Sequence, residues 1–228
     1  MDRTFSDTKH SAYRRIDPFY EGLWDGGGTG VAWISVFQAR AQVAGGRGWF
    51  PSTWQMSDEE ALEIISSSRY RNQIISVMGA LFQWQNLTAE QLADLTGYRG
   101  LSANFEDRSH SSKVLLALFT LGLIEYGQAR DGVWEKQRRY APKMYRVSTR
   151  PKRYEKLIGQ NLSWGEQLAV TAGLPPAGGR SAGRHNVLGS ELGLRAAQVL
   201  PVGAVFGERL RGVDALNYLS AGQEPARP

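Results

Sequence analysis

The 228-residue sequence contains no cysteine. This absence excludes disulfides, thiolate zinc sites and cysteine nucleophiles, and it is typical of proteins kept in a reducing compartment. No apolar run approaches 18 residues, and the N-terminal residues lack the pattern of a signal peptide. We therefore expect a soluble cytoplasmic protein with no membrane partner.

Residues that carry catalysis are also scarce. The three histidines, His10, His110 and His185, are far apart in the sequence, and none belongs to a His-x-Glu or Glu-x-x-His metal pattern. The glycine-rich run at 26–30 lacks the lysine of a phosphate-binding loop and is interpreted as a turn. We expect no catalytic residues, no bound metal and no cofactor, and hence a protein that is not an enzyme.

Positive charge is abundant but unevenly distributed. The net charge is +5, yet residues 130–156 contain ten basic and three acidic residues, so the remainder of the chain is net negative. Such a concentration is typical of proteins that bind a polyanion. A solvated basic face is the alternative interpretation.

Helix-capping patterns mark out the middle of the chain. Ser57 and Glu60 predict the start of one helix, and residues 71–85 form a second helix with a wide apolar stripe. Thr88 and Gln91, with a Leu87–Leu92 staple, predict a helix that ends at Gly97.

Residues 109–122 predict a third, leucine-rich helix of this central region. The stretches 123–126 and 144–148 predict two strands, joined by a basic hairpin with an Arg-Asp-Gly turn. We also expect helices over 31–44, from Leu162 to Gly173 and over 185–200, a loop over 173–184, and a short strand over 202–206.

This order predicts a winged helix-turn-helix over residues 56–150. The fold class is mainly α with a small β-wing (α+β). Residues 1–55 form an aromatic, glycine-rich N-terminal extension, which is a candidate for protein partners. Residues 151–184 hold a helix and a Gly/Pro-rich hinge, and 185–228 hold a C-terminal helix and strand that open a further domain.

In a winged helix the third helix enters the major groove and the hairpin reaches an adjacent groove or phosphate row, so the expected partner is double-stranded DNA. The link from Gly97 to Ser109 is longer than the tight motif allows; either 102–105 starts the helix early or the loop adds contacts of its own. The candidate DNA-binding residues are Thr88, Arg99, Arg108, Ser109, His110, Ser111, Lys113, Arg130, Lys136, Arg138 and Arg139.

The segments 87–92, 115–124, 144–148 and 184–188 together resemble the actinobacterial replication-relaxation family of plasmids and mobile elements. In that family a nuclease-like α/β domain follows the winged helix, and this sequence ends without the matching carboxylates. The resemblance implies a DNA-binding protein of a plasmid, phage or other mobile element that acts in replication, mobilisation or transcription control. Two alternatives stay open: a winged helix used for protein interaction in a larger assembly, and an accessory fragment of a nuclease-like enzyme in which Glu191 or His185 is the remnant of a site.

Overall fold

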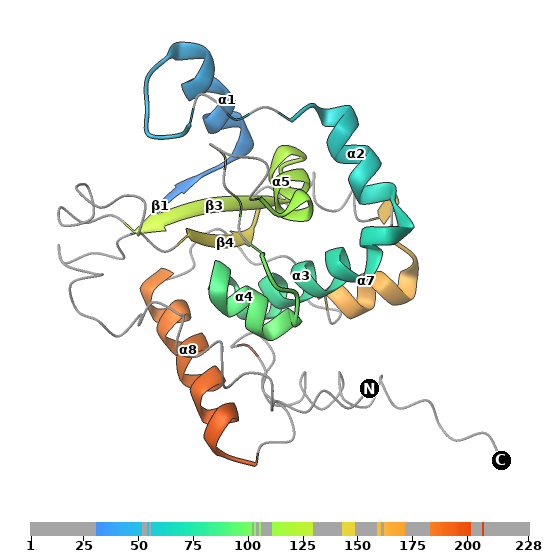
Figure 1. Cartoon of the computed structure of the whole chain (residues 1–228), viewed down its shortest axis with the longest axis vertical. Helices are drawn as coiled ribbons and strands as arrows, with labels where there is room; N and C mark the ends of the chain where they lie inside the picture. The colour runs from blue at the N-terminus through green and yellow to red at the C-terminus, as the bar shows by residue number, and fades with distance from the viewer. Residues whose placement is uncertain are drawn as a thin grey trace.

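The computed structural model describes residues 31–51, 54, 56–101, 103, 105, 111–129, 143–148, 159–160, 162–171, 183–201 and 207. Their fold is α+β, with helices packed around a small antiparallel sheet (Figure 1). The strands are β1 (Val31–Ile34), β2 (Asn86–Thr88), β3 (Ile124–Ala129) and β4 (Lys143–Val147), and the helices are α1 (Val36–Gly45), α2 (Asp58–Ser66), the 3₁₀ turn η3 (Ser68–Tyr70), α3 (Arg71–Trp84), α4 (Ala89–Thr96), α5 (Lys113–Thr120), α7 (Trp164–Thr171) and α8 (Gly183–Val199).

The described strands form one sheet in the order β1-β3-β4-β2. β3 and β4 pair antiparallel from Ile124↔Val147 to Gln128↔Lys143, as expected for the two arms of a hairpin. β2 adds to the far side of β4, and β1 adds to the far side of β3. Residues 86–88 therefore form both a short strand and, at Thr88, the cap of the next helix.

The predicted helix starts and ends depend on local chemistry, and most are confirmed. The Ser57 side chain accepts from the Glu60 amide, and Thr88 and Gln91 form a complete capping box. α4 ends at Gly97 in the left-handed conformation, a backbone state that favours glycine. α7 and α8 lie where helices are expected, although residues 183–184, assigned to the loop, belong to the start of α8.

The helix expected over 31–44 is wrong at its first four residues. Val31–Ile34 is strand β1, and Ser35 ends the strand and caps α1 through a capping box with Gln38. Because β1 pairs with β3 from Val31↔Ala129 to Ile34↔Tyr126, the boundary expected at residue 55 does not separate two cores. The sheet and the core both cross it.

One apolar core lies between the sheet and the helices. Residues from the N-terminal part of the chain enter it: Ile34, Val36, Phe50 and Trp54 are all buried with the leucines of α5. α2 lies beside α5 on one side of the sheet, and α7 lies along α3 (Figure 1). α8 contacts β2 and α4, so it packs on the same body as these elements.

Candidate nucleic-acid interface

The basic hairpin predicted from the sequence begins and ends on paired strands. β3 and β4 are hydrogen-bonded up to Gln128↔Lys143, so the strand ends that border residues 130–142 in the sequence lie at the same end of the sheet. The tip of the hairpin, with the candidate residues Arg130, Lys136, Arg138 and Arg139, lies outside the described residues, as does the Arg-Asp-Gly turn. The structure gives the two strand ends that this segment joins, Ala129 of β3 and Lys143 of β4.

The third helix starts later than the sequence pattern predicts. Ser112 is extended and its hydroxyl accepts from the Leu115 amide, so it is the N-cap and α5 begins at Lys113, not at Ser109. Ser111 is half-buried and Lys113 is exposed just at this end. Arg108, Ser109 and His110 lie outside the described residues.

The body of α5 is buried on every side. Each residue from Val114 to Thr120 is buried, because α2 packs along α5 and aromatic rings from the N-terminal part of the chain cover its end. The Phe50 and Phe119 rings stack at 5.5 Å, and Trp54 meets Phe119 edge-on at 5.6 Å. A helix that is hydrophobic all round is a core helix, so beyond its first residue α5 presents no surface that could enter a major groove.

The loop between α4 and α5 also contributes to the core. Leu101, Ala103 and Phe105 are buried; the Ala103 amide donates to the Tyr145 hydroxyl at 2.7 Å, and the Phe105 ring lies 4.7 Å from Phe50. The extra length of the link is thus used partly for packing. Arg99, by contrast, is exposed between two left-handed glycines, Gly97 and Gly100, where it can contact a polyanion.

Thr88 and the start of α4 face the inside of the molecule. Thr88 is 7% exposed, and its hydroxyl accepts from the Gln91 amide. The Gln91 side chain donates to the Val187 carbonyl at 2.9 Å and to the Glu191 carboxylate at 3.1 Å, both on α8. α8 therefore covers the N-terminus of α4, and Thr88, a candidate DNA-binding residue in the sequence, acts as a cap and a packing residue.

Arg146 belongs to the basic segment in the sequence, but its charge is already paired. It pairs across the sheet with Glu125, and its guanidinium donates twice to that carboxylate, at 2.8 and 2.6 Å. The guanidinium also lies 4.3 Å from the Trp33 ring. Since only 14% of the Arg146 side chain and 6% of the Glu125 side chain are exposed, this cation is unavailable to a polyanion and the basic excess is one charge smaller than the sequence suggests.

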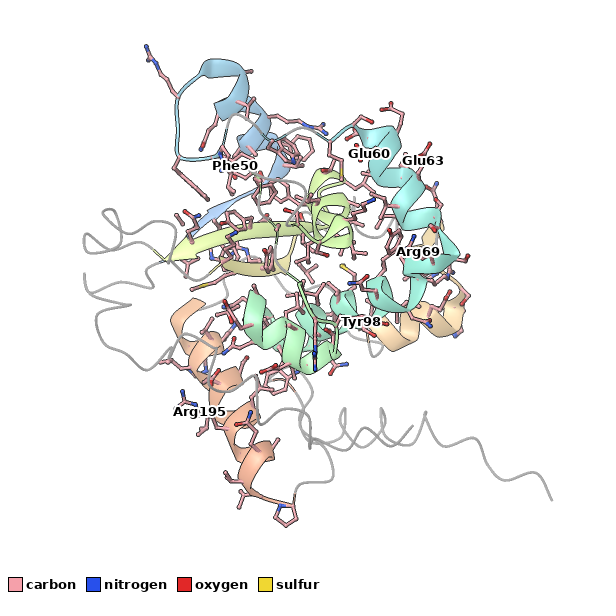
Figure 2. The ribbon with its side chains drawn as sticks, in the orientation of Figure 1. Phe50, Glu60, Glu63, Arg69, Tyr98 and Arg195 are labelled. Carbon is pink, nitrogen blue, oxygen red and sulfur yellow. The ribbon has the colours of Figure 1, made fainter. Side chains whose placement is uncertain are left out.

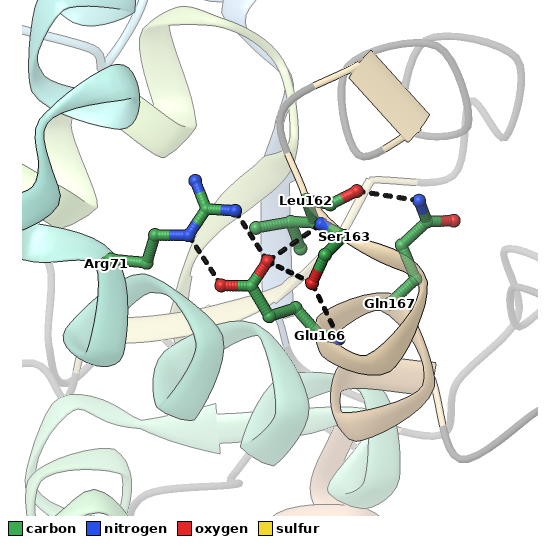
Figure 3. Close-up of polar contacts among 5 residues, drawn as sticks. All are labelled: Arg71, Leu162, Ser163, Glu166 and Gln167. Atoms are coloured by element: carbon green, nitrogen blue, oxygen red, sulfur yellow. Dashed lines mark hydrogen bonds and ion pairs between the residues drawn. The ribbon is translucent and has the colours of Figure 1, made fainter.

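A second ion pair fastens α7 to the rest of the fold (Figure 3). Arg71, at the start of α3, donates to both oxygens of Glu166 at 2.5 Å, and the Ser163 hydroxyl and amide donate to the same carboxylate. The Arg71 hydrogen bonds, followed by those of Ser163, hold the pKa of Glu166 at about 2, below its usual 4.5. The bond to Glu166 in turn raises the pKa of Arg71. The sequence predicts a helix from Leu162 to Gly173 but contains no signal that Glu166 pairs with an arginine 95 residues away.

Glu191 and His185, the two residues considered as nuclease remnants, lie in different environments. Glu191 is buried at 1% exposure and accepts from Arg195 at 2.9 Å as well as from Gln91, whereas His185, earlier on α8, is exposed. Within the part of the chain that the structure describes, no group of three or more histidines and carboxylates could hold a metal ion.

Comparison with known proteins finds no match: neither a family model nor a curated protein nor a solved structure is similar to this chain. None of the helices in the described ranges has the length and apolar character needed to cross a bilayer.

Proposed function

We propose that this chain is a non-enzymatic double-stranded DNA-binding protein of the winged-helix type, acting in replication, mobilisation or transcription control on a plasmid, phage or other mobile element. The order α3-β2-α4-α5-β3-β4, with β2 and β3 on either side of β4, is the order of elements in a winged helix-turn-helix and supports the proposal. The resemblance to the replication-relaxation family supplies the mobile-element context, and a place beside cytoplasmic DNA is part of the same proposal.

One observation carries the proposal: the most basic stretch of the sequence begins as the connection between two hydrogen-bonded strands at one end of the sheet. Lys113 and Arg99 add exposed positive charge on the neighbouring helix and loop. Because the α5 body is buried, the contacts we propose are chiefly to phosphates, made by the hairpin, Lys113 and Arg99. Phosphate contacts give affinity that depends strongly on salt and little on sequence.

The test is the salt dependence of binding to a duplex. If four to six phosphates are neutralised, log K should fall against log salt with a slope of roughly −4 to −5. Replacing Arg138 and Arg139 by alanine should flatten the slope by about one to two units. The matched control replaces Arg47 and Arg69, two exposed arginines of the described residues, and should leave the slope unchanged. Equal slopes for the two double variants would refute binding through the hairpin.

Lys113 separates groove reading from phosphate contact. We expect Lys113→Ala to weaken binding to a selected site and to random DNA by the same factor, because α5 has one exposed residue instead of an exposed face. A loss confined to the selected site, worth about 1–3 kcal/mol, would mean that this residue reads a base edge.

A winged helix used for protein interaction is the second candidate, and the burial of α5 favours it. The salt dependence of duplex binding distinguishes the two functions. Binding of duplex DNA that is weak at low salt and insensitive to the Arg138 and Arg139 changes would favour the protein-interaction function. Nicking of supercoiled DNA in Mg²⁺ or Mn²⁺ by the unmodified protein would instead favour the nuclease alternative.

A further inference from the structure

Of the α-helices that the structure describes, α8 alone contributes no residue to the apolar core between the sheet and the helices. Its buried apolar residues, Val187, Leu194 and Ala197, are not part of that core, whereas α1 to α5 and α7 each place buried residues in it. α8 instead packs on β2 and α4. A segment that shares few contacts with the core can open while the rest of the protein stays folded. We therefore expect α8 to detach at a lower free energy than that of global unfolding.

Hydrogen bonds between polar groups orient α8 on this surface. Asn186 donates to Asn86 at 2.7 Å. The Gln91 side chain donates to the Val187 carbonyl at 2.9 Å and to the Glu191 carboxylate at 3.1 Å. The net stabilisation from such bonds is small, because the same groups bond to water when they are exposed. These bonds therefore set the position of α8 without making its release costly.

The start of α4, which α8 covers, lies at the same end of the sheet as the two strand ends that border the basic segment 130–142. Thr88, the N-cap of α4, pairs with Met144, next to Lys143 where β4 begins. The first amides of a helix have no acceptor within the helix, and the positive end of the helix dipole favours a phosphate there. Uncovered, the start of α4 would extend the phosphate-binding surface proposed for the hairpin.

The group that α8 places beside this helix start is itself an anion. Glu191 is buried, and its carboxylate accepts from Gln91, the third residue of α4. The oxygen of the same Gln91 side chain accepts from the Thr88 amide at 3.1 Å, so the carboxylate lies one hydrogen bond away from the capping box. A carboxylate at the start of a helix makes the kind of charge-assisted bond that a phosphate oxygen makes in the same place.

From these observations we infer that α8 is an autoinhibitory helix: Glu191 acts in place of a phosphate at the start of α4, and duplex DNA displaces α8 when it binds. The inference rests on the proposed function and adds the regulation of the same site. The apparent affinity of a site that is open in only a fraction of the molecules is reduced by that fraction. If α8 is open in about 1–10% of molecules, full release of α8 strengthens duplex binding about ten- to a hundredfold.

The first test compares the duplex affinity of Glu191→Ala with that of a charge-matched control. Glu191→Ala removes the acceptor of the Gln91 bond, so binding should be at least about tenfold tighter and the salt slope about one unit steeper. Glu63→Ala changes the net charge equally on α2, on the other side of the molecule from Arg195 of α8 (Figure 2), and should change the affinity less than about twofold. Equal gains in the two variants would mean a general charge effect and would overturn the inference.

Hydrogen exchange of the unmodified protein gives a second measurement that needs no variant. A saturating random-sequence duplex should speed exchange of the α8 amides at least about tenfold and leave those of α7 unchanged. Duplex binding with α8 equally or better protected would refute autoinhibition and leave the DNA-binding function standing. Failure of both the unmodified chain and Glu191→Ala to bind duplex at low salt would refute the DNA-binding function, and autoinhibition with it.

Discussion

Replacing Arg146 by methionine removes the guanidinium that pairs with Glu125 but keeps an apolar chain over Trp33. The Glu125 carboxylate is nearly buried and loses both charge-assisted bonds, at 2.8 and 2.6 Å. Removing one partner of a buried ion pair costs about 3–5 kcal/mol. Since 14% of the Arg146 side chain is exposed, we expect the lower end, about 3 kcal/mol. That is a large part of the 5–15 kcal/mol by which a domain is typically stable.

The assay is urea unfolding of four proteins: the unmodified chain, Arg146→Met, Glu125→Met and the double variant. Replacing both partners by apolar residues is often nearly neutral, so the double variant should recover most of the loss, with a coupling free energy of about 2 kcal/mol or more. A loss below about 1 kcal/mol for Arg146→Met, with no coupling, is the behaviour of an exposed pair. That result would refute the conclusion that Arg146 serves the fold and would leave it available to the proposed DNA-binding surface.

Three further predictions concern stability. The pKa of Glu166 is lowered to about 2 from 4.5, so its contribution to the free energy of unfolding is fully present above about pH 4.5 and is lost as the pH falls toward 2. When the free energy of unfolding is measured against pH, Glu166→Gln should lack the part of the pH dependence that lies in this window. In thermal unfolding, Gly127→Ala should destabilise the protein, because an added Cβ would lie 2.7 Å from the Trp33 ring. Gly189→Ala on α8, where an added Cβ meets nothing within 4 Å, should be neutral or should stabilise the protein by about 0.5–1 kcal/mol. Gly207→Ala should lower the melting temperature more than Gly189→Ala, because its Cβ meets the Gln83 backbone.

The elements that the sequence predicts best are those whose ends are set by hydrogen bonds between residues close together in the sequence. Thr88 and Gln91 begin α4 and Gly97 ends it, all within ten residues, and the capping pair Ser163 and Glu166 begins α7. Each of these signals involves residues three or four apart, so no knowledge of the tertiary fold is needed to find them.

The sequence does not predict β1, because its four residues are too few to show an alternating pattern and only Ser35 separates them from the apolar residues Val36 and Phe37 of α1. The signal that was present is the capping box of Ser35 and Gln38, which marks where the helix begins. Residues 31–34 are a strand because they pair with the edge of β3. This contact joins distant parts of the chain, so no local sequence pattern encodes it.

The candidate site is predictable in its charge but not in its exposure. The sequence locates the basic stretch, and it does not show that Arg146 is paired or that Thr88 lies under α8. The burial of α5 did have a signal: between Lys113 and Thr120 the helix has no polar residue, and a groove-reading helix needs a polar face. The remaining contacts join residues about 100 positions apart, such as Gln91 with Glu191.

The pairing of β1 with β3 joins Val31 to Ala129, about 100 residues later in the chain. Contacts between such distant residues close a long loop and slow folding, so β1, Phe50 and Trp54 should reach α5 late, after β3 and β4 have found each other. Until then the far face of α5 and the outer edge of β3 are open, and an unpaired strand edge is a template for association with another chain. A piece that begins at residue 56 keeps the elements from α2 to β4 but would hold this unfinished state permanently. We therefore expect this piece to aggregate more readily than the full chain, because without β1 the outer edge of β3 stays unpaired.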